Sequence, residues 1–168
     1  MPETVFGLPT HAIVVHATVV LLPLAALAVL LHAFWPVARR RLGIVTPVLA
    51  GVALVLVPLS TQSGESLERS VGHNALVERH AELADGMLPW AIGLFVVAVG
   101  LWLLARRRER TAGVGEPGWV ALVASVLAVV AVVGTVQQIV RVGHAGAQAT
   151  WDGVVSTANT SGGGSDNG

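Results

Sequence analysis

Four long apolar stretches dominate the sequence, and they limit what the chain can fold into. They cover about residues 12–35, 42–60, 87–105 and 119–142. A helix needs about 20 mostly apolar residues to cross a bilayer core, and all four stretches come close to or exceed that length. Each is apolar on every side rather than along one stripe, which is typical of a membrane span. The sequence therefore predicts an all-α fold, an integral membrane four-helix bundle.

Composition supports this class and excludes others. Charged residues make up 12% of the 168-residue chain, against about 25% in a typical soluble domain, and the mean hydropathy is +0.72. A net charge of zero gives no reason to expect nucleic acid as a partner. Because the chain has no Cys and no Lys, thiolate metal sites and a lysine Schiff base are excluded. No hydrolytic motif is recognisable, so we expect no independent catalytic activity.

The distribution of arginine predicts the orientation in the membrane. The connections after the first and third spans contain Arg39, Arg40, Arg41, Arg106, Arg107, Arg108 and Arg110, whereas the opposite side has only Arg69, Arg79 and Arg141. Short arginine-rich connections stay in the cytoplasm, so we expect both termini outside it. Residues 1–152 would form the transmembrane domain. The Gly/Ser-rich residues 153–168 are expected to be a disordered extracytoplasmic tail.

The connection between the second and third spans is longer than a tight turn. Its first part, residues 61–64, is polar and is expected to be irregular. From about Asn74 onward, the pattern predicts an amphipathic helix that runs into the third span as an extracytoplasmic extension. Its apolar face holds Leu76, His80, Leu83 and Met87, and its opposite face holds Glu78, Glu82 and Asp85. We therefore expect His80 to point into the protein.

The fourth span carries a polar stripe at positions i, i+4, i+7 and i+11, formed by Gln137, Arg141, His144 and Gln148. Polar groups on a membrane helix usually face the bundle interior, so His144 is a second inward candidate. Counted from the cytoplasmic ends of their spans, His16, His80 and His144 lie within about 5 Å of one depth. His11 would lie about 8 Å further out, and about 140° around the helix from His16. His32 lies near the cytoplasmic end and cannot join them.

Ionisable residues inside a membrane are rare and costly, so each is a candidate functional residue. Two histidines from different helices can hold a haem iron, and we would pair His16 with His80 or with His144. Three histidines could bind zinc or copper, and the candidate ligands are then His11, His16, His80 and His144. Any single histidine could instead cap a backbone group or meet lipid headgroups. The small residues Gly51, Gly93, Gly100 and Gly134 would allow close helix approach.

Several motifs together resemble a bacterial family of membrane proteins called domain of unknown function 2231. His11-Ala12-Ile13-Val14-Val15-His16 is similar to the family's HPLLVHFP motif, and Gly64, His80-Ala81 and Gly143-His144-Ala145-Gly146-Ala147 follow in the family's order. The resemblance covers about residues 8–153. Ala12 and Thr18 stand where the family often has Pro, which puts a helix kink in doubt. The resemblance implies a compact four-helix domain in the bacterial cytoplasmic membrane.

The same resemblance implies little about activity. Some members are joined to Rieske-type iron–sulfur domains, which favours redox work, and the layout is similar to that of membrane b-type cytochromes. Our leading hypothesis is a small membrane protein that binds haem b through His16 and His80, with His144 and Arg141 beside them or His144 as an alternative ligand. It would pass electrons to an outer partner or within a larger respiratory or redox complex. The alternatives are a zinc or copper site at the outer face, and a structural subunit without a cofactor.

Overall fold

The computed structural model describes residues 4–5, 8–71, 75–111 and 117–161. Two short strands, β1 (Thr4–Val5) and β2 (Leu8–Pro9), pair antiparallel ahead of the helices. Six helices follow: α1 (Thr10–Phe34), α2 (Pro36–Leu42), α3 (Val45–Val71), α4 (Ala75–Asp85), α5 (Met87–Arg110) and α6 (Gly118–Ser161). The prediction of an all-α bundle is confirmed.

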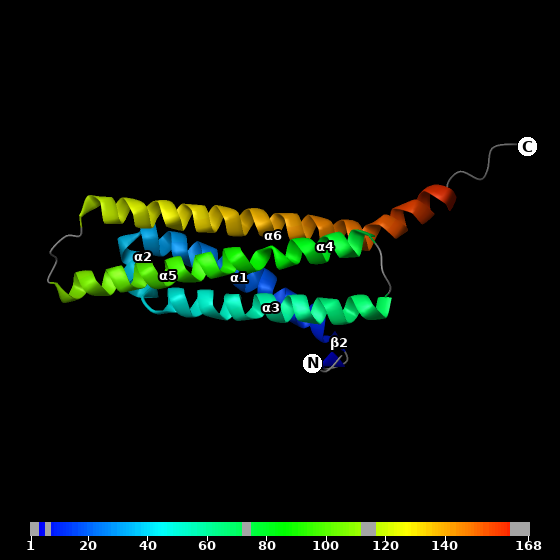
Figure 1. The fold of residues 1–168 in the computed structure, drawn as a ribbon, viewed down its shortest axis with the longest axis horizontal. Helices are drawn as coiled ribbons and strands as arrows, with labels where there is room; N and C mark the ends of the chain where they lie inside the picture. Colours follow the sequence, from blue (N-terminus) through cyan, green and yellow to red (C-terminus); the bar gives the residue numbers. More distant parts are fainter. Residues whose placement is uncertain (1–3, 6–7, 72–74, 112–116, 162–168) are drawn as a thin grey trace, which may run out of the picture.

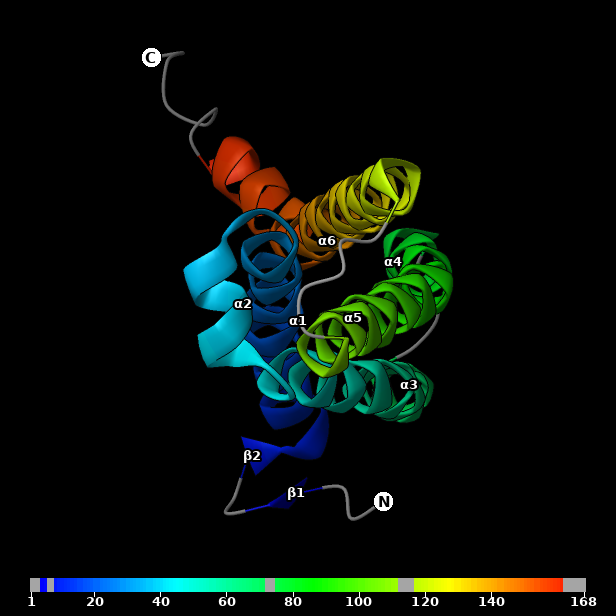
Figure 2. The ribbon, with the colours of Figure 1, turned by 90° about the vertical axis from the view of Figure 1, so that its left-hand side faces the viewer.

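Four segments are long and apolar enough to cross a membrane: His11–Phe34, Val45–Ser66, Ala75–Arg110 and Gly118–Trp151. The third comprises α4 and α5, which meet at Gly86 almost in line, so the amphipathic extension ahead of the third span is confirmed (Figure 1). The main contacts between segments follow the order α1, α3, α5, α6 and back to α1 (Figure 2). The short helix α2 lies on the outside of α1.

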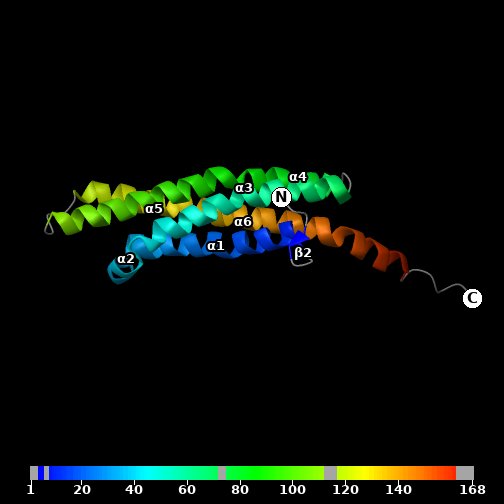
Figure 3. The same ribbon diagram turned by 90° about the horizontal axis from the view of Figure 1, so that it is seen from below.

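The bundle has two chemically different ends. We call the end with α2 and the last turn of α5 the arginine end, and the opposite end, where α3 ends and α4 begins, the histidine end. Helix α6 runs along the whole bundle and continues beyond it at the histidine end (Figure 3). Residues up to Ser161 that the sequence assigned to a tail are therefore part of α6, and residues 162–168 lie outside the described part.

The core consists mainly of small side chains. Its buried residues include Ala25, Ala53, Ala91, Ala98, Ala128 and Ala131, while many Val and Leu side chains face outward. Small residues let membrane helices approach closely, since lipid provides no hydrophobic drive between them. An added Cβ at Gly51 would lie 3.2 Å from Phe95, and one at Gly134 would overlap the Trp90 ring, as expected for close contacts. At Gly93 and Gly100 an added Cβ meets nothing within 4 Å, so these two do not mark close approaches.

The polar residues that follow the second span are helical, and the prediction of an irregular segment at residues 61–64 is wrong. Helix α3 continues to Val71, and its hydroxyl side chains bond to the helix's own carbonyls. Thr61 donates to the Pro58 carbonyl at 3.2 Å, and Ser63 donates to the Ser60 carbonyl at 2.9 Å. Such local bonds satisfy the hydroxyls without leaving the helix. The extra turns bring Ser63 and Gly64 alongside the start of α1.

Candidate functional site

His11 stands in the first turn of α1 and faces α3. Its Nδ1 atom lies 3.0 Å from the Ser63 hydroxyl oxygen. The single Ser63 proton is donated to the Ser60 carbonyl, so the hydroxyl can only accept from His11. This network places the ring proton on Nδ1, and the Ser60 carbonyl also interacts with the ring. The Nε2 atom of His11 therefore carries a lone pair, and the described residues form no hydrogen bond to it.

His80 on α4 repeats this arrangement against a different helix. Its Nδ1 lies 3.1 Å from the Val142 carbonyl oxygen on α6. A carbonyl can only accept, so the proton again sits on Nδ1 and the lone pair on Nε2. As with His11, the described part of the chain offers no hydrogen bond to this Nε2 atom. The two imidazoles are thus held in the same tautomer by oxygens from two separate helices.

A glycine on the neighbouring helix accommodates each ring. A Cβ added at Gly64 would lie 3.1 Å from Cε1 of His11, and one at Gly146 would lie 3.0 Å from Cε1 of His80. Both separations are tighter than ordinary contact between carbon atoms, about 3.5–4.0 Å. Any larger residue at either position would push the ring away. The two glycines therefore set how closely each imidazole approaches the backbone opposite it.

Both histidines line one cavity of about 610 Å³ at the histidine end. Side chains from α1, α3, α4 and α6 form its walls, and most of them are apolar, such as Leu22, Val57 and Ile139. The residues Glu65 and Asp85 are also on its wall. Its size falls within the range of about 300–1,000 Å³ that is usual for small-molecule sites. An apolar cavity with a few polar groups is the common form of a ligand site.

The other predicted site residues lie elsewhere. His16 is exposed, and its Nδ1 bonds to the Ala12 carbonyl of its own helix at 2.6 Å. His144 and Arg141 are also exposed, on the outward side of α6. The expectation that His16 and His144 face inward with His80 is therefore wrong, while the inward direction of His80 is correct. His11, which the sequence placed only in the metal set, is the histidine that joins His80.

The prediction for α6 was wrong about the rotation of the helix about its axis, and so about which side chains face the bundle. Its buried polar side chain is Gln138, 7% exposed, which donates to the Leu83 carbonyl of α4 at 2.6 Å. Gln137, which belongs to the expected inward stripe, is exposed. The stripe from Gln137 to Gln148 thus runs along the outer surface of the helix. No group of three or more His, Asp or Glu suited to a metal ion occurs in the described ranges.

The sequence reasoning set His32 apart and did not detect Ser63 or Thr46. His32 is fully buried near the arginine end, where its Nδ1 lies 3.1 Å from the Thr46 hydroxyl. Ser63 is 8% exposed and fixes the His11 tautomer. If the predicted second span had been continued as a helix past residue 60, the spacing of Ser60 and Ser63 would have placed both hydroxyls near one face, opposite the start of α1.

Comparison with known proteins gives a single type of match. The family model described as "Predicted membrane protein (DUF2231)" matches residues 7–159, most of the chain. Neither the search of curated proteins nor that of solved structures found a match. The match agrees with the four candidate spans, and the cavity at the histidine end lies wholly within the matched residues.

Proposed function

Since the chain belongs to the DUF2231 family of predicted membrane proteins, we propose a function that rests on the cavity at its histidine end. The protein binds haem b in this cavity, with His11 and His80 as the axial ligands. One observation carries the proposal: two imidazoles from different helices line one apolar cavity, and each has Nδ1 bound and Nε2 unbound among the described residues. This pair replaces the His16–His80 pair that the sequence favoured.

The donor set fits a haem iron. Histidines that bind a metal usually donate their other ring N–H to an oxygen, which orients the ring and raises the basicity of the ligating nitrogen. The Ser63 hydroxyl and the Val142 carbonyl supply these oxygens. Haem bound there would supply one-electron redox chemistry, with a potential set by the axial ligands and by burial. The protein's own contribution is to fix two imidazoles and to surround them with apolar walls.

Arg141 does not take part in the proposed haem site. It is exposed on the outer side of α6 and does not line the cavity. The zinc or copper alternative is less favoured, because the described residues offer no suitable group of three ligands. A structural role without a cofactor is the alternative. A larger redox complex is the electron partner that the proposal implies.

We also propose the orientation. The arginine end faces the cytoplasm of a bacterial cell, and the cavity with both termini lies on the outer side of the cytoplasmic membrane. The support is the charge pattern, since Arg40, Arg41, Arg106 and Arg107 are all exposed at the arginine end.

The test is the visible spectrum of the protein purified in detergent from cells supplied with haem precursor. We expect a Soret band that shifts on reduction. His11→Ala and His80→Ala should each lose it, because a bis-histidine site fails without either ligand. His16→Ala is the matched control, since it removes an exposed histidine of the same helix five residues away, and it should keep the band. A band absent from the native protein, or one lost equally in all three variants, contradicts the proposal.

A further inference from the structure

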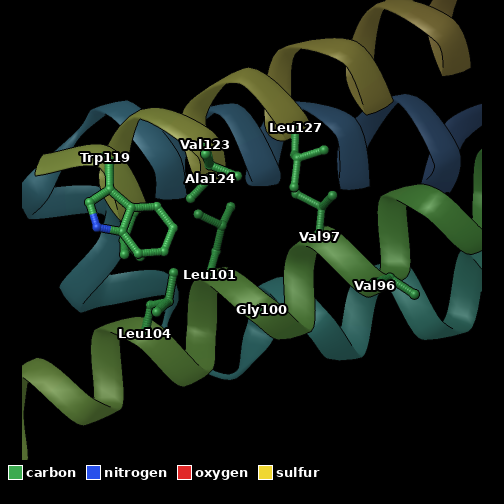
Figure 4. A pocket seen from close by; sticks show the side chains of 10 residues that line it. Val96, Val97, Gly100, Leu101, Leu104, Trp119, Val123, Ala124 and Leu127 are labelled. Carbon is green, nitrogen blue, oxygen red and sulfur yellow. The ribbon is translucent and has the colours of Figure 1, made fainter. Parts of the chain in front are cut away.

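A second feature lies at the arginine end, far from the histidine cavity. A groove of about 290 Å³ runs between α5 and α6, and its walls are almost entirely apolar. Figure 4 shows the Trp119 ring reaching from α6 towards Leu101 and Leu104 of α5. Val123 and Leu127 on α6 are exposed, so the groove opens to the membrane side of the bundle.

The α5 side of the groove leads to a charged group. Leu101 and Leu104 line the groove, and Arg108 lies seven and four residues after them, on the same face of the helix. The Nε atom of Arg108 is buried and has no hydrogen-bond partner among the described residues. A buried donor of a charged group without a partner is costly, so this atom marks a place where an acceptor is missing.

Arg39 from α2 lies at the same end of the bundle as Arg108, at the end of α1. Its Nε and one terminal nitrogen donate to the His32 and Ala33 carbonyls at 2.9 and 2.6 Å, which fixes the guanidinium over the end of α1. Burial, and then the nearby positive charge of Arg108, lower the pKa of Arg39. The described part of the chain provides neither guanidinium with an acidic partner. An anion bound at this end would form charge-assisted hydrogen bonds with these guanidiniums and offset their positive charge.

We propose that this end binds one anionic phospholipid, with its phosphate between Arg39 and Arg108 and an acyl chain in the groove. Guanidinium groups form paired hydrogen bonds with phosphate oxygens, which suits the two partly buried arginines. Basic pockets between membrane helices can hold lipid headgroups on the cytoplasmic side. The apolar groove continues along α5 from the same arginine, so both parts of one lipid molecule are matched. This site is independent of the haem proposal.

The experiment measures lipid binding to delipidated protein in detergent, by native mass spectrometry and by titration. The probes are dioleoyl phosphatidylglycerol, dioleoyl phosphatidylcholine and inorganic phosphate. We expect the anionic lipid to bind at least about tenfold more tightly than the zwitterionic one, because the choline cation of the latter would be repelled by the two arginines. Arg108→Gln should weaken binding of the anionic lipid by about tenfold, whereas Arg107→Gln, at an exposed neighbour, should not.

A second variant tests the groove. Gly100 lines it, and Gly100→Leu adds a side chain where a Cβ meets nothing within 4 Å, so it should block the acyl chain without disturbing the fold. Gly93→Leu is the control, since its Cβ position is equally open but lies outside the groove. Equal binding of the two lipids overturns the proposal, as does lipid binding that neither Arg108→Gln nor Gly100→Leu weakens. Phosphate binding that matches the lipid and survives Gly100→Leu would assign the site to a soluble anion instead.

Discussion

Gly134 and Trp90 are in such close contact that Gly134→Ala should change the free energy of unfolding in opposite directions in the native chain and in a Trp90→Ala variant. Gly134 on α6 is buried beneath the Trp90 ring of α5, and an added Cβ would overlap the ring atoms Cζ3, Cε3 and Cη2. Elsewhere in a helix, replacing Gly by Ala stabilises by about 0.5–1 kcal/mol, because Gly loses more freedom on folding. At Gly134 the overlap opposes this gain, so the substitution tests how closely α5 and α6 approach.

The overlap between the added Cβ and the Trp90 ring determines how much Gly134→Ala destabilises the fold. Ordinary contact between carbon atoms is about 3.5–4.0 Å, so the ring must leave its place or the helices must separate. Inserting a methyl group into a packed site of this kind costs about 1–3 kcal/mol. After subtraction of the helix gain, Gly134→Ala should lower the free energy of unfolding by about 1–2 kcal/mol. In a Trp90→Ala background the overlap disappears, and the same change should raise it by about 0.5–1 kcal/mol.

The assay is reversible unfolding in mixed micelles, followed by circular dichroism, for the four members of a double-mutant cycle. Gly143→Ala is the matched control on the same helix, because its Cβ position meets nothing within 4 Å and only the helix gain applies. Gly134→Ala and Gly143→Ala should therefore differ in sign. If Gly134→Ala stabilises as much as Gly143→Ala, or if Trp90→Ala leaves its effect unchanged, the close packing of α5 and α6 is refuted.

Two further predictions concern packing and orientation. Gln138→Leu removes the donor to the Leu83 carbonyl and should lower the free energy of unfolding by about 1–3 kcal/mol in the same assay. Gln137→Leu, at an exposed neighbour, should change it by less than about 0.5 kcal/mol. Equal effects of the two substitutions would contradict the burial of Gln138. A reporter active only outside the cytoplasm should be active at the C-terminus and silent when inserted after Thr111, and the opposite pattern would invert the proposed orientation.

The spans could be predicted from the sequence, but the rotation of the helices and the pairing of the histidines could not. Apolar length determines where a helix crosses the membrane. In contrast, α1 is apolar on all sides, so no stripe indicates which side faces its neighbours. His11 and His16 differ by about 140° around the axis, and only packing against Ser63 and Gly64 decides between them. Choosing His16 was an error of both angle and depth, because His11, which was expected about 8 Å further out, shares the cavity with His80.

The polar side of α6 misled the prediction for a related reason. Membrane helices usually turn polar groups inward, but Arg141 and His144 are exposed although their neighbours Val142 and Gly146 pack against His80. The contact that fixes its rotation is a single amide, Gln138, bonded to the Leu83 carbonyl. Gln137 and Gln138 are adjacent and chemically identical, so composition gives no means of choosing between them.

The two imidazoles are anchored to different pairs of helices. His11 is tied to α3 through Ser63, and His80 is tied to α6 through Val142. A sliding motion of the α1–α3 pair against the α4–α6 pair would change the separation of the two Nε2 atoms while leaving both anchoring bonds intact. The separation of the two Nε2 atoms is therefore set by how the two helix pairs pack against each other, and not by either anchoring bond alone.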